Sequence, residues 1–159
     1  MATAGTPLGA DCYTKDMKLH IVTVGEPKLA YAKAGWDEYL KRLRRYHTVR
    51  ASHVPDKFAY NAAYLQQVAG GAYRVALVID GTQFTSPELA AFLEKRAVEA
   101  REVCLLVGGP EGLPQEVIAT ADLQLGLSRL TFPHDLAMVV LLEAVYRAST
   151  ITAGQPYHK

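Results

Sequence analysis

The 159-residue sequence has the length of one ordinary domain, half of its residues are hydrophobic and 21% are charged. This balance predicts a globular protein with a hydrophobic core and excludes a disordered chain. The net charge of +1 excludes an overall basic field, so any nucleic acid would have to be bound by local basic patches or by a second subunit.

Residues 1–16 have no periodic pattern and are rich in Ala, Gly and Thr, whereas the first periodic segment begins at Met17. We expect 1–16 to be a flexible N-terminal extension and 17–159 to form the folded domain. The N-terminus lacks the charged start and apolar core of a signal peptide. The most apolar stretch, around 139–142, is followed by Glu143 and is too short to span a membrane. We therefore expect a cytoplasmic protein without a membrane partner.

Apolar segments with the periodicity of strands alternate with segments of helical periodicity along the rest of the chain. The strands are predicted at 18–24, 49–54, 74–80, 102–107 and 123–127, and the helices at 28–46, 60–69, 87–100, 114–121 and 134–149. The segments RVALVID and EVCLLVG are almost continuously apolar, which is typical of strands covered on both faces. This alternation predicts an α/β fold with a mainly parallel sheet flanked by helices.

Two of the predicted helices carry additional information. The helix at 28–46 has an apolar face and a surface crowded with Lys33, Lys41, Arg42, Arg44 and Arg45, which is either a solvated face or a patch that contacts phosphates. The helix at 134–149 is apolar nearly all round, so we expect it to be covered on several sides. The covering partner is either the rest of this chain, around a central helix, or a second copy in a homodimer.

The sequence contains no pattern for a metal site. Its two cysteines, Cys12 and Cys104, form no CxxC or Cys/His spacing, and no pair of its five histidines has the spacing of metal ligands. Cys104 lies in the apolar run VCLLVG, so we expect a buried free thiol. No metal cofactor is expected.

Two segments at predicted strand ends are candidates for binding a ligand. Strand 102–107 runs into GGPEGLP (108–114), and in open α/β sheets ligands bind beyond the carboxyl ends of strands. Glycines there allow a close backbone approach, although Gly108 and Gly109 alone also suit an ordinary tight turn. The segment LSRLTFPH (127–134) offers backbone polar groups and apolar walls suited to a nucleoside-like ligand, or simply the start of a helix. Neither segment is a GxGxxG motif or a P-loop.

The motifs VALVIDG, LLVGGPEGL, LSRLTFPH, LLEAVYRA and the C-terminal PYHK follow one another at characteristic distances from the chain end. Together with KLHIVTVG from Met17 and the later WDEYLKRL, this order closely resembles the RlmH (YbeA-type) family of SPOUT methyltransferases. The resemblance covers 17–159. It implies a SPOUT-type sheet with a C-terminal trefoil knot, and a homodimer.

The resemblance also implies an activity and its site. The activity is methylation, with S-adenosyl-L-methionine, of N3 of a pseudouridine in a stem-loop of 23S rRNA within the assembled ribosome. The residues implied to meet the target base are Arg147, Tyr157 and His158, across the dimer. The residues implied to bind the cofactor are Leu77, Gly108, Gly109, Leu127, Ser128, Arg129, Leu130, Thr131 and Phe132.

One position departs from the family pattern, because Met138 stands where the family usually has a basic residue early in the long helix. Two other functions remain alternatives. One is a ribosome-binding module without catalysis, in which case Tyr157 and His158 belong to a frayed end. The other is a different α/β nucleotide enzyme, which the lack of GxGxxG and P-loop motifs disfavours.

Overall fold

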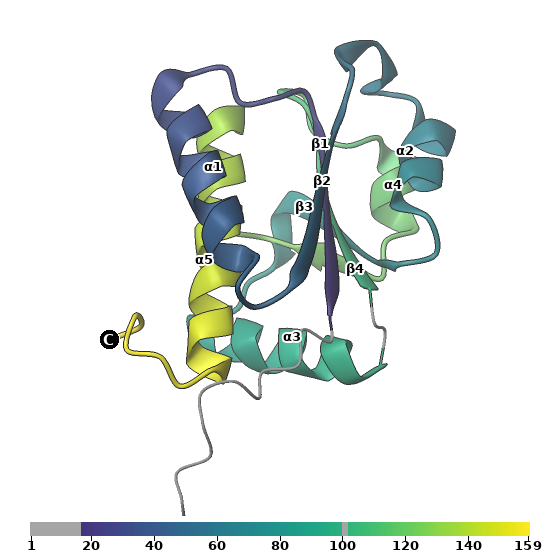
Figure 1. The fold of residues 1–159 in the computed structure, drawn as a ribbon. Helices are drawn as coiled ribbons and strands as arrows, with labels where there is room; N and C mark the ends of the chain where they lie inside the picture. The colour runs from purple at the N-terminus through teal and green to yellow at the C-terminus, as the bar shows by residue number, and fades with distance from the viewer. Residues whose placement is uncertain (1–16, 100–101) are drawn as a thin grey trace, which may run out of the picture.

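The computed structural model describes residues 17–99 and 102–159, so the predicted extension at 1–16, with Cys12, lies outside the described residues. The described chain forms one five-stranded sheet in the order β2-β1-β4-β3-β5 (Figure 1). All pairs of neighbouring strands are parallel. The strands are β1 (Lys18–Val24), β2 (Thr48–Val54), β3 (Tyr73–Thr82), β4 (Glu102–Val107) and β5 (Leu123–Leu125).

Helices cover both faces of this sheet and give three layers. The helices are α1 (Ala30–Leu43), α2 (Ala62–Ala69), α3 (Ser86–Glu99), α4 (Gln115–Ala119) and α5 (His134–Thr152), and a short 3-10 helix spans Asp56–Phe58. One hydrophobic core joins α1, α3 and α5 to one face of the sheet, and a second joins α2 and α4 to the other (Figure 1). The period-two alternation of the strands sends Leu19 and Ile21 into the first core and Val22 and Val24 mainly into the second.

The structure confirms the α/β class and each predicted element; β1 and β4 have the predicted ends, and the ends of the others differ. Helix α5 continues to Thr152, three residues beyond the predicted 149, although β-branched residues fill its last turn. Burial of Thr150 against the core outweighs the weak local preference. The helix ends where Gly154 takes a φ of 67°, and the N–H groups of Gly154 and Gln155 donate to Ile151 O and Thr150 O. This arrangement is a Schellman motif, which turns the tail back along the helix.

Local contacts between neighbouring residues fix the start of α3. The Thr85 N–H donates to the Glu88 carboxylate at 2.7 Å, and the Glu88 N–H donates to the Thr85 hydroxyl at 3.3 Å, so the two residues form a reciprocal capping box. The predicted buried free thiol is also confirmed. Cys104 is fully buried in β4, and burial raises the pKa of its thiol to about 12.

Helix α5 is the central helix of its layer. It packs against α1 on one side, α3 on the other and the sheet beneath, and it buries Met138, Leu141, Leu142 and Val145. Met138, the position that departs from the family pattern, is thus a core residue. The expectation of cover on several sides is confirmed, and much of that cover comes from the chain itself. No helix in the described ranges has the length and apolarity needed to cross a membrane.

Candidate functional site

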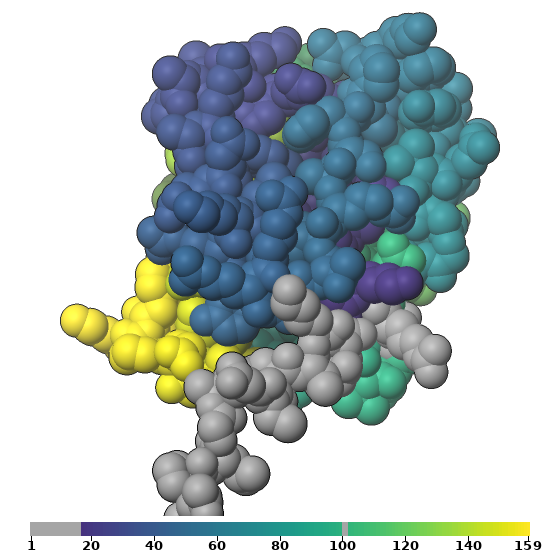
Figure 2. Space-filling view, in the orientation of Figure 1, coloured from purple at the N-terminus to yellow at the C-terminus, as the bar shows by residue number. Residues whose placement is uncertain are grey.

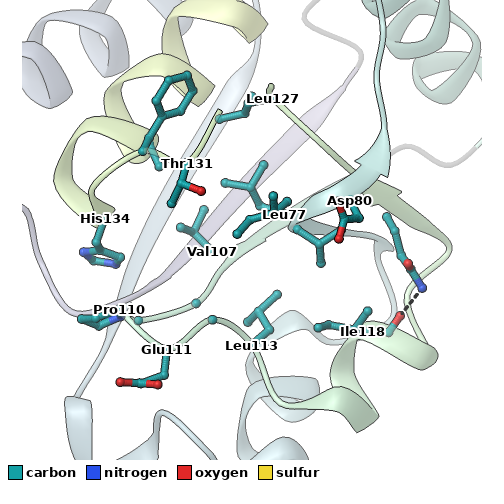
Figure 3. A pocket seen from close by; sticks show the side chains of 18 of the residues that line it. Leu77, Asp80, Val107, Pro110, Glu111, Leu113, Ile118, Leu127, Thr131 and His134 are labelled. Atoms are coloured by element: carbon teal, nitrogen blue, oxygen red, sulfur yellow. Dashed lines mark hydrogen bonds between the residues drawn. The ribbon is translucent and has the colours of Figure 1, made fainter. Parts of the chain in front are cut away.

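The connections after β3 and β4 diverge at the carboxyl end of the sheet. The chain leaves β3 toward α3 on one face and leaves β4 toward α4 on the other. Such a divergence opens a crevice beyond the strand ends. A cavity of about 500 Å³, the strand-end cavity, occupies this position (Figure 3).

Three chain segments surround the strand-end cavity. It is lined by the end of β3 (Leu77, Val78, Ile79 and Asp80), by the loop and helix after β4 (Val107 to Leu113, Gln115 and Ile118), and by the segment from β5 into α5 (Gln124, Leu127, Ser128, Leu130, Thr131, Phe132, His134 and Ala137). Both segments that the sequence indicated, GGPEGLP and LSRLTFPH, therefore meet at one site.

The loop after β4 needs glycine because its backbone packs closely against itself. A Cβ atom at Gly108 would collide with the backbone of Gly112 and lie 2.5 Å from Leu113 N, while Gly112 itself has a φ of +83°. The Gly112 N–H donates to Gly109 O at 2.9 Å. The structure therefore gives Gly108 a role that does not depend on a ligand. The residue first allows the loop to fold back on itself, so substituting it would distort the cavity wall.

A second pair of glycines lies next to the cavity, where the end of β3 meets the chain that follows β5. A Cβ atom at Gly81 would lie 2.5 Å from the Leu125 carbonyl carbon, and one at Gly126 would lie 2.9 Å from Gly81 O. The Gly126 N–H donates to Thr82 O at 3.0 Å, beyond the irregularity in the β3–β5 register. The carboxyl end of β3 is thus held against the start of the segment that leads to α5.

The cavity combines apolar walls with a few polar side chains. The apolar surface is provided by Leu77, Val107, Leu113 and Ile118. Figure 3 shows Pro110 and Glu111 below His134, on the side of the cavity away from Asp80 and Ile118. Its volume is that of a site for a small organic molecule, and backbone groups of two loops line it. The residues present fit a nucleoside-type ligand such as S-adenosyl-L-methionine.

The structure brings together every residue that the resemblance implied for the cofactor, with one exception. Leu77, Gly108, Gly109, Leu127, Ser128, Leu130, Thr131 and Phe132 all line the strand-end cavity. Arg129 is exposed and does not line it. The Leu130 N–H donates to the Ser128 hydroxyl at 3.0 Å, so the chain makes a tight turn at Arg129.

Three titratable residues that line the cavity were not named as site residues from the sequence: Asp80, Glu111 and His134. Asp80 directly follows the apolar run of β3, and Glu111 lies within GGPEGLP, so both carried the signal of a polar residue just beyond a strand. His134 is both the last residue of the candidate segment LSRLTFPH and the first residue of the predicted helix at 134–149.

The three residues implied to meet the target base also lie together, on the outer side of α5. The tail cluster consists of Tyr39, Glu143, Tyr146, Arg147, Tyr157 and His158. Glu143 is its centre, because one carboxylate oxygen accepts from Arg147 Nε at 2.9 Å, from an Arg147 Nη at 2.6 Å and from the Tyr157 hydroxyl at 3.1 Å. Arg147 Nη1 also donates to His158 Nδ1 at 3.4 Å.

Aromatic contacts complete the tail cluster. The Arg147 guanidinium lies 4.7 Å from the centre of the Tyr157 ring, which meets Tyr146 edge-on at 4.8 Å. Burial, the hydroxyl of Tyr39 and the Glu143 carboxylate raise the pKa of Tyr157 above its usual value. The phenol therefore stays neutral and serves as a hydrogen-bond donor. Figure 2 shows the C-terminal segment, in yellow, at the molecular surface.

The tail cluster is remote from the strand-end cavity of its own chain. His134 lines the cavity at the first turn of α5, whereas Arg147 lies thirteen residues further along the same helix. At 1.5 Å per residue the two are separated by about 20 Å. One chain alone therefore does not bring Arg147, Tyr157 and His158 to a ligand in its own cavity.

The histidines outside these two sites have structural partners. His20 Nε2 lies 2.8 Å from the Ser52 hydroxyl, and His53 Nδ1 lies 2.6 Å from the Thr23 hydroxyl. His47 Nε2 lies 2.8 Å from the Ser149 hydroxyl. Across residues 17–99 and 102–159 no group of three His, Cys, Asp or Glu side chains could hold a metal ion.

Comparison with known proteins identifies what this chain resembles. Residues 17–158 match a family model described as "Predicted SPOUT methyltransferase". The chain is 51% identical over 145 residues to a protein of Deinococcus deserti named "Ribosomal RNA large subunit methyltransferase H", with 90% of this chain and 100% of that protein covered. A protein of the same name from Thermus thermophilus is 42% identical over 143 residues, with 90% and 99% covered.

A solved structure supports the fold independently. The tRNA (m1G37) methyltransferase from Aquifex aeolicus superposes with a TM-score of 0.53 at 11% sequence identity, and the match covers 90% of this chain and 73% of that one. At this identity the likeness concerns the fold alone.

Proposed function

Because the chain belongs to the SPOUT methyltransferase family, and within it resembles the ribosomal RNA large subunit methyltransferases H along the matched length, we propose that it methylates bacterial large-subunit ribosomal RNA with S-adenosyl-L-methionine. The target is N3 of a pseudouridine in a stem-loop of 23S rRNA, on the assembled ribosome. The reaction takes place in the cytoplasm. We also propose that the C-terminal segment passes through the trefoil knot of the fold.

The observation that carries this proposal is the strand-end cavity. Two separate segments, 108–113 and 127–132, converge there with backbone polar groups, while Leu77 and Leu113 add apolar walls. An adenosyl group needs such walls for its base and polar partners for its ribose, and the cavity volume suits a ligand of this size. Every cofactor residue that the resemblance implied lines this cavity, apart from Arg129.

The bound cofactor would supply an electrophilic methyl group on a sulfonium. The chain then has three tasks: to hold the donor, to place the target N3 in line with the methyl group, and to remove the N3 proton. Leu77, Gly108 and the 127–132 segment perform the first task. Arg147, Tyr157 and His158 perform the second. The third falls to the His158 imidazole, which takes the N3 proton, because the phenol of Tyr157 donates hydrogen bonds and does not accept the proton.

The separation of about 20 Å along α5 favours a site composed of two chains. In this proposal the protein is a homodimer, and the tail cluster of one subunit lies at the strand-end cavity of its partner. The outward stripe of α5 has half-buried apolar residues, including Leu136 and Val140, that a partner subunit would cover. Exposed apolar side chains at the cavity, Ile79 and Leu130, offer further surface for such a contact.

The experiment that tests the activity uses ribosomes that lack the modification. They are incubated with the protein and labelled S-adenosyl-L-methionine, and the 23S rRNA is then digested and mapped by mass spectrometry. We expect one added methyl group, on a single pseudouridine. A protein that binds ribosomes without binding the cofactor or transferring a methyl group would instead be a ribosome-binding module.

Deleting residues 157–159 tests the tail. We expect methyl transfer to fall by at least about a hundredfold, because the residues that orient the base and assist proton transfer are lost. Cofactor affinity, measured by calorimetry, should remain unchanged, because the residues proposed to hold the cofactor all belong to the cavity and none belongs to the tail. A truncated enzyme with wild-type rates would show that Tyr157 and His158 are dispensable.

A further inference from the structure

The loop after β2 is rich in aromatic residues that the proposed reaction does not use. We call Lys57, Phe58, Tyr60 and Tyr64 the aromatic rim. The rings of Phe58 and Tyr64 stack with their centres 4.2 Å apart and pack against the second core, so they anchor the loop. The Tyr60 side chain is 67% exposed, and its ring contacts no other ring in the described part of the chain. The rim thus presents one free aromatic ring on an anchored loop.

Backbone hydrogen bonds hold Tyr60 in position between two short structures. On one side the Asn61 N–H donates to Phe58 O at 3.0 Å, which closes the turn after the 3-10 helix. On the other side the Asn61 side chain accepts the Tyr64 N–H at 3.0 Å and caps α2. Because the loop is already ordered, a partner that stacks on Tyr60 pays little for immobilising it.

The aromatic rim also carries a positive charge. Lys57 Nζ lies 5.0 Å from the centre of the Phe58 ring. The neighbouring Asp56 carboxylate lies 3.9 Å from Lys28 Nζ, and no ion pair to Lys57 is found among the residues that the structure describes. An exposed ammonium beside an exposed aromatic ring suits single-stranded nucleic acid, because the ring stacks on a base and the cation meets a phosphate.

The aromatic rim lies at the same edge of the sheet as the strand-end cavity. The strands are parallel, so the segments that follow β2, β1 and β4 emerge side by side in this order. The Gly25 N–H donates to Val54 O at 2.8 Å, and a Cβ atom at Gly109 would lie 3.5 Å from Val24 Cγ1. Figure 1 shows the segment between β2 and α2 at the opposite end of the molecule from the C-terminus.

The distance from the cavity to the rim matches the spacing of an RNA loop. Strands β2 and β4 are two strand spacings apart, which is about 10 Å. At about 3.4 Å per stacked base, this distance corresponds to about three nucleotides. A base that enters the cavity therefore leaves its near neighbours within reach of Tyr60.

We propose that the aromatic rim binds an unpaired nucleotide next to the target base in the ribosomal RNA, with Tyr60 stacked on its base and Lys57 at a phosphate. This inference rests on the proposed function, which places the target base at the cavity. Unpaired bases of RNA loops are recognised by stacking on aromatic side chains. The net charge of +1 provides little general attraction for RNA, so stacking supplies affinity that phosphate contacts do not.

The kinetics of Tyr60→Ala on ribosomes that lack the modification test the stacking contact. We expect the KM for ribosomes to rise about tenfold, because one stacked base is lost, while kcat and cofactor affinity stay within about twofold. Tyr60→Phe keeps the ring and should retain the wild-type KM. Tyr31→Ala is the matched control, because Tyr31 is also exposed but lies on α1, which covers the other face of the sheet. It should leave the KM unchanged.

Photo-crosslinking identifies what the ring contacts. Tyr60→p-benzoylphenylalanine places a photoreactive group at this position, and irradiation of its complex with ribosomes should join it to 23S rRNA close to the methylated base. A crosslink to a ribosomal protein, or none to RNA, would overturn the inference. A wild-type KM for Tyr60→Ala, or an equal rise for Tyr31→Ala, would also overturn it, while methylation by the wild type keeps the proposed function intact. A wild-type protein that transfers no methyl group would overturn the proposed function itself.

Discussion

At the scale of single residues, buried imidazoles link the stability of this protein to pH. His47 follows α1 and its Nε2 lies 2.8 Å from the Ser149 hydroxyl, which itself donates to Val145 O. Since that hydroxyl proton is used, Nε2 carries the proton of the neutral ring. Burial lowers the pKa of His47 to about 4. Burial and the nearby Arg50 guanidinium likewise lower the pKa of His20.

We expect the free energy of unfolding to decrease as the pH falls from about 6.5 to about 4. In this window the unfolded chain binds a proton at His47 that the folded protein does not, so stability is complete above the unfolded pKa and is lost below it. The slope from one such group approaches 1.4 kcal/mol per pH unit, by an order-of-magnitude estimate. Urea unfolding at several pH values should show a smaller slope for His47→Gln, and an unchanged slope would contradict the assignment.

At the scale of elements, the contact between α1 and α5 depends on a glycine in α1. A Cβ atom at Gly35 of α1 would lie 3.0 Å from Val139 Cγ1 of α5. The glycine therefore allows the two helices to approach closely, at the cost of a poor helix former inside α1.

Gly35→Leu should destabilise the fold by about 1–3 kcal/mol, because the added side chain overpacks the helix contact. Ala34→Leu is the matched control, since Ala34 is exposed on the same helix, and it should change stability by less than about 0.5 kcal/mol. Denaturant unfolding of both variants measures the difference. If the two variants were equally stable, Val139 of α5 would have moved to make room for the added side chain.

The basic surface of α1 divides into residues with different surroundings. Arg42 donates to Glu38 at 2.7 Å and lies over the rings of Tyr39 and Tyr146, so it belongs partly to the packing around the tail. Arg44 and Arg45 are exposed just after the helix. A test of RNA contact is therefore cleaner at Arg44 and Arg45 than at Arg42.

Changing Arg44 and Arg45 together to Glu should raise the KM for ribosomes about tenfold or more at low salt, because two phosphate contacts become repulsive. The kcat and the cofactor affinity should be unchanged. The effect should diminish as the salt concentration rises. A KM equal to that of the wild type across the salt series would identify this patch as a solvated face.

At the scale of the whole molecule, one chain holds the strand-end cavity and the tail cluster at separate places along α5. The strand-end cavity lies at the first turn of α5, and the tail cluster lies beyond its middle. This arrangement predicts activity in mixed dimers of two variants that are each inactive alone. Gly108→Val distorts the cavity wall, and the deletion of 157–159 removes the tail.

Coexpression of these two variants should restore about one quarter of the wild-type methyl transfer. Half of a random mixture is heterodimer, and each heterodimer contains one site with both an intact cavity and an intact tail. Light scattering should give a mass of about twice 17.4 kDa for each preparation. Zero recovery from confirmed heterodimers would show that cavity and tail act within one chain.

Periodicity and composition alone predicted the elements and the class of this fold. The apolar runs of β3 and β4 require cover on both faces, and Thr85 and Glu88 specify the start of α3 through contacts three residues apart. The glycine-rich loop after β4 and the segment 127–134 were recognisable because ligands bind beyond strand ends. These are local properties, so neighbouring residues suffice to encode them.

The tertiary structure alone decided which distant groups meet. The strand order brings 108–113 beside 127–132, places Gly108 against Gly112, and turns Arg129 away from the cavity. The return of the chain at Gly154 brings Tyr157 back onto Glu143, fourteen residues earlier. Such contacts depend on how whole elements pack, because burial and register are determined by the assembled core and not by any short stretch of sequence.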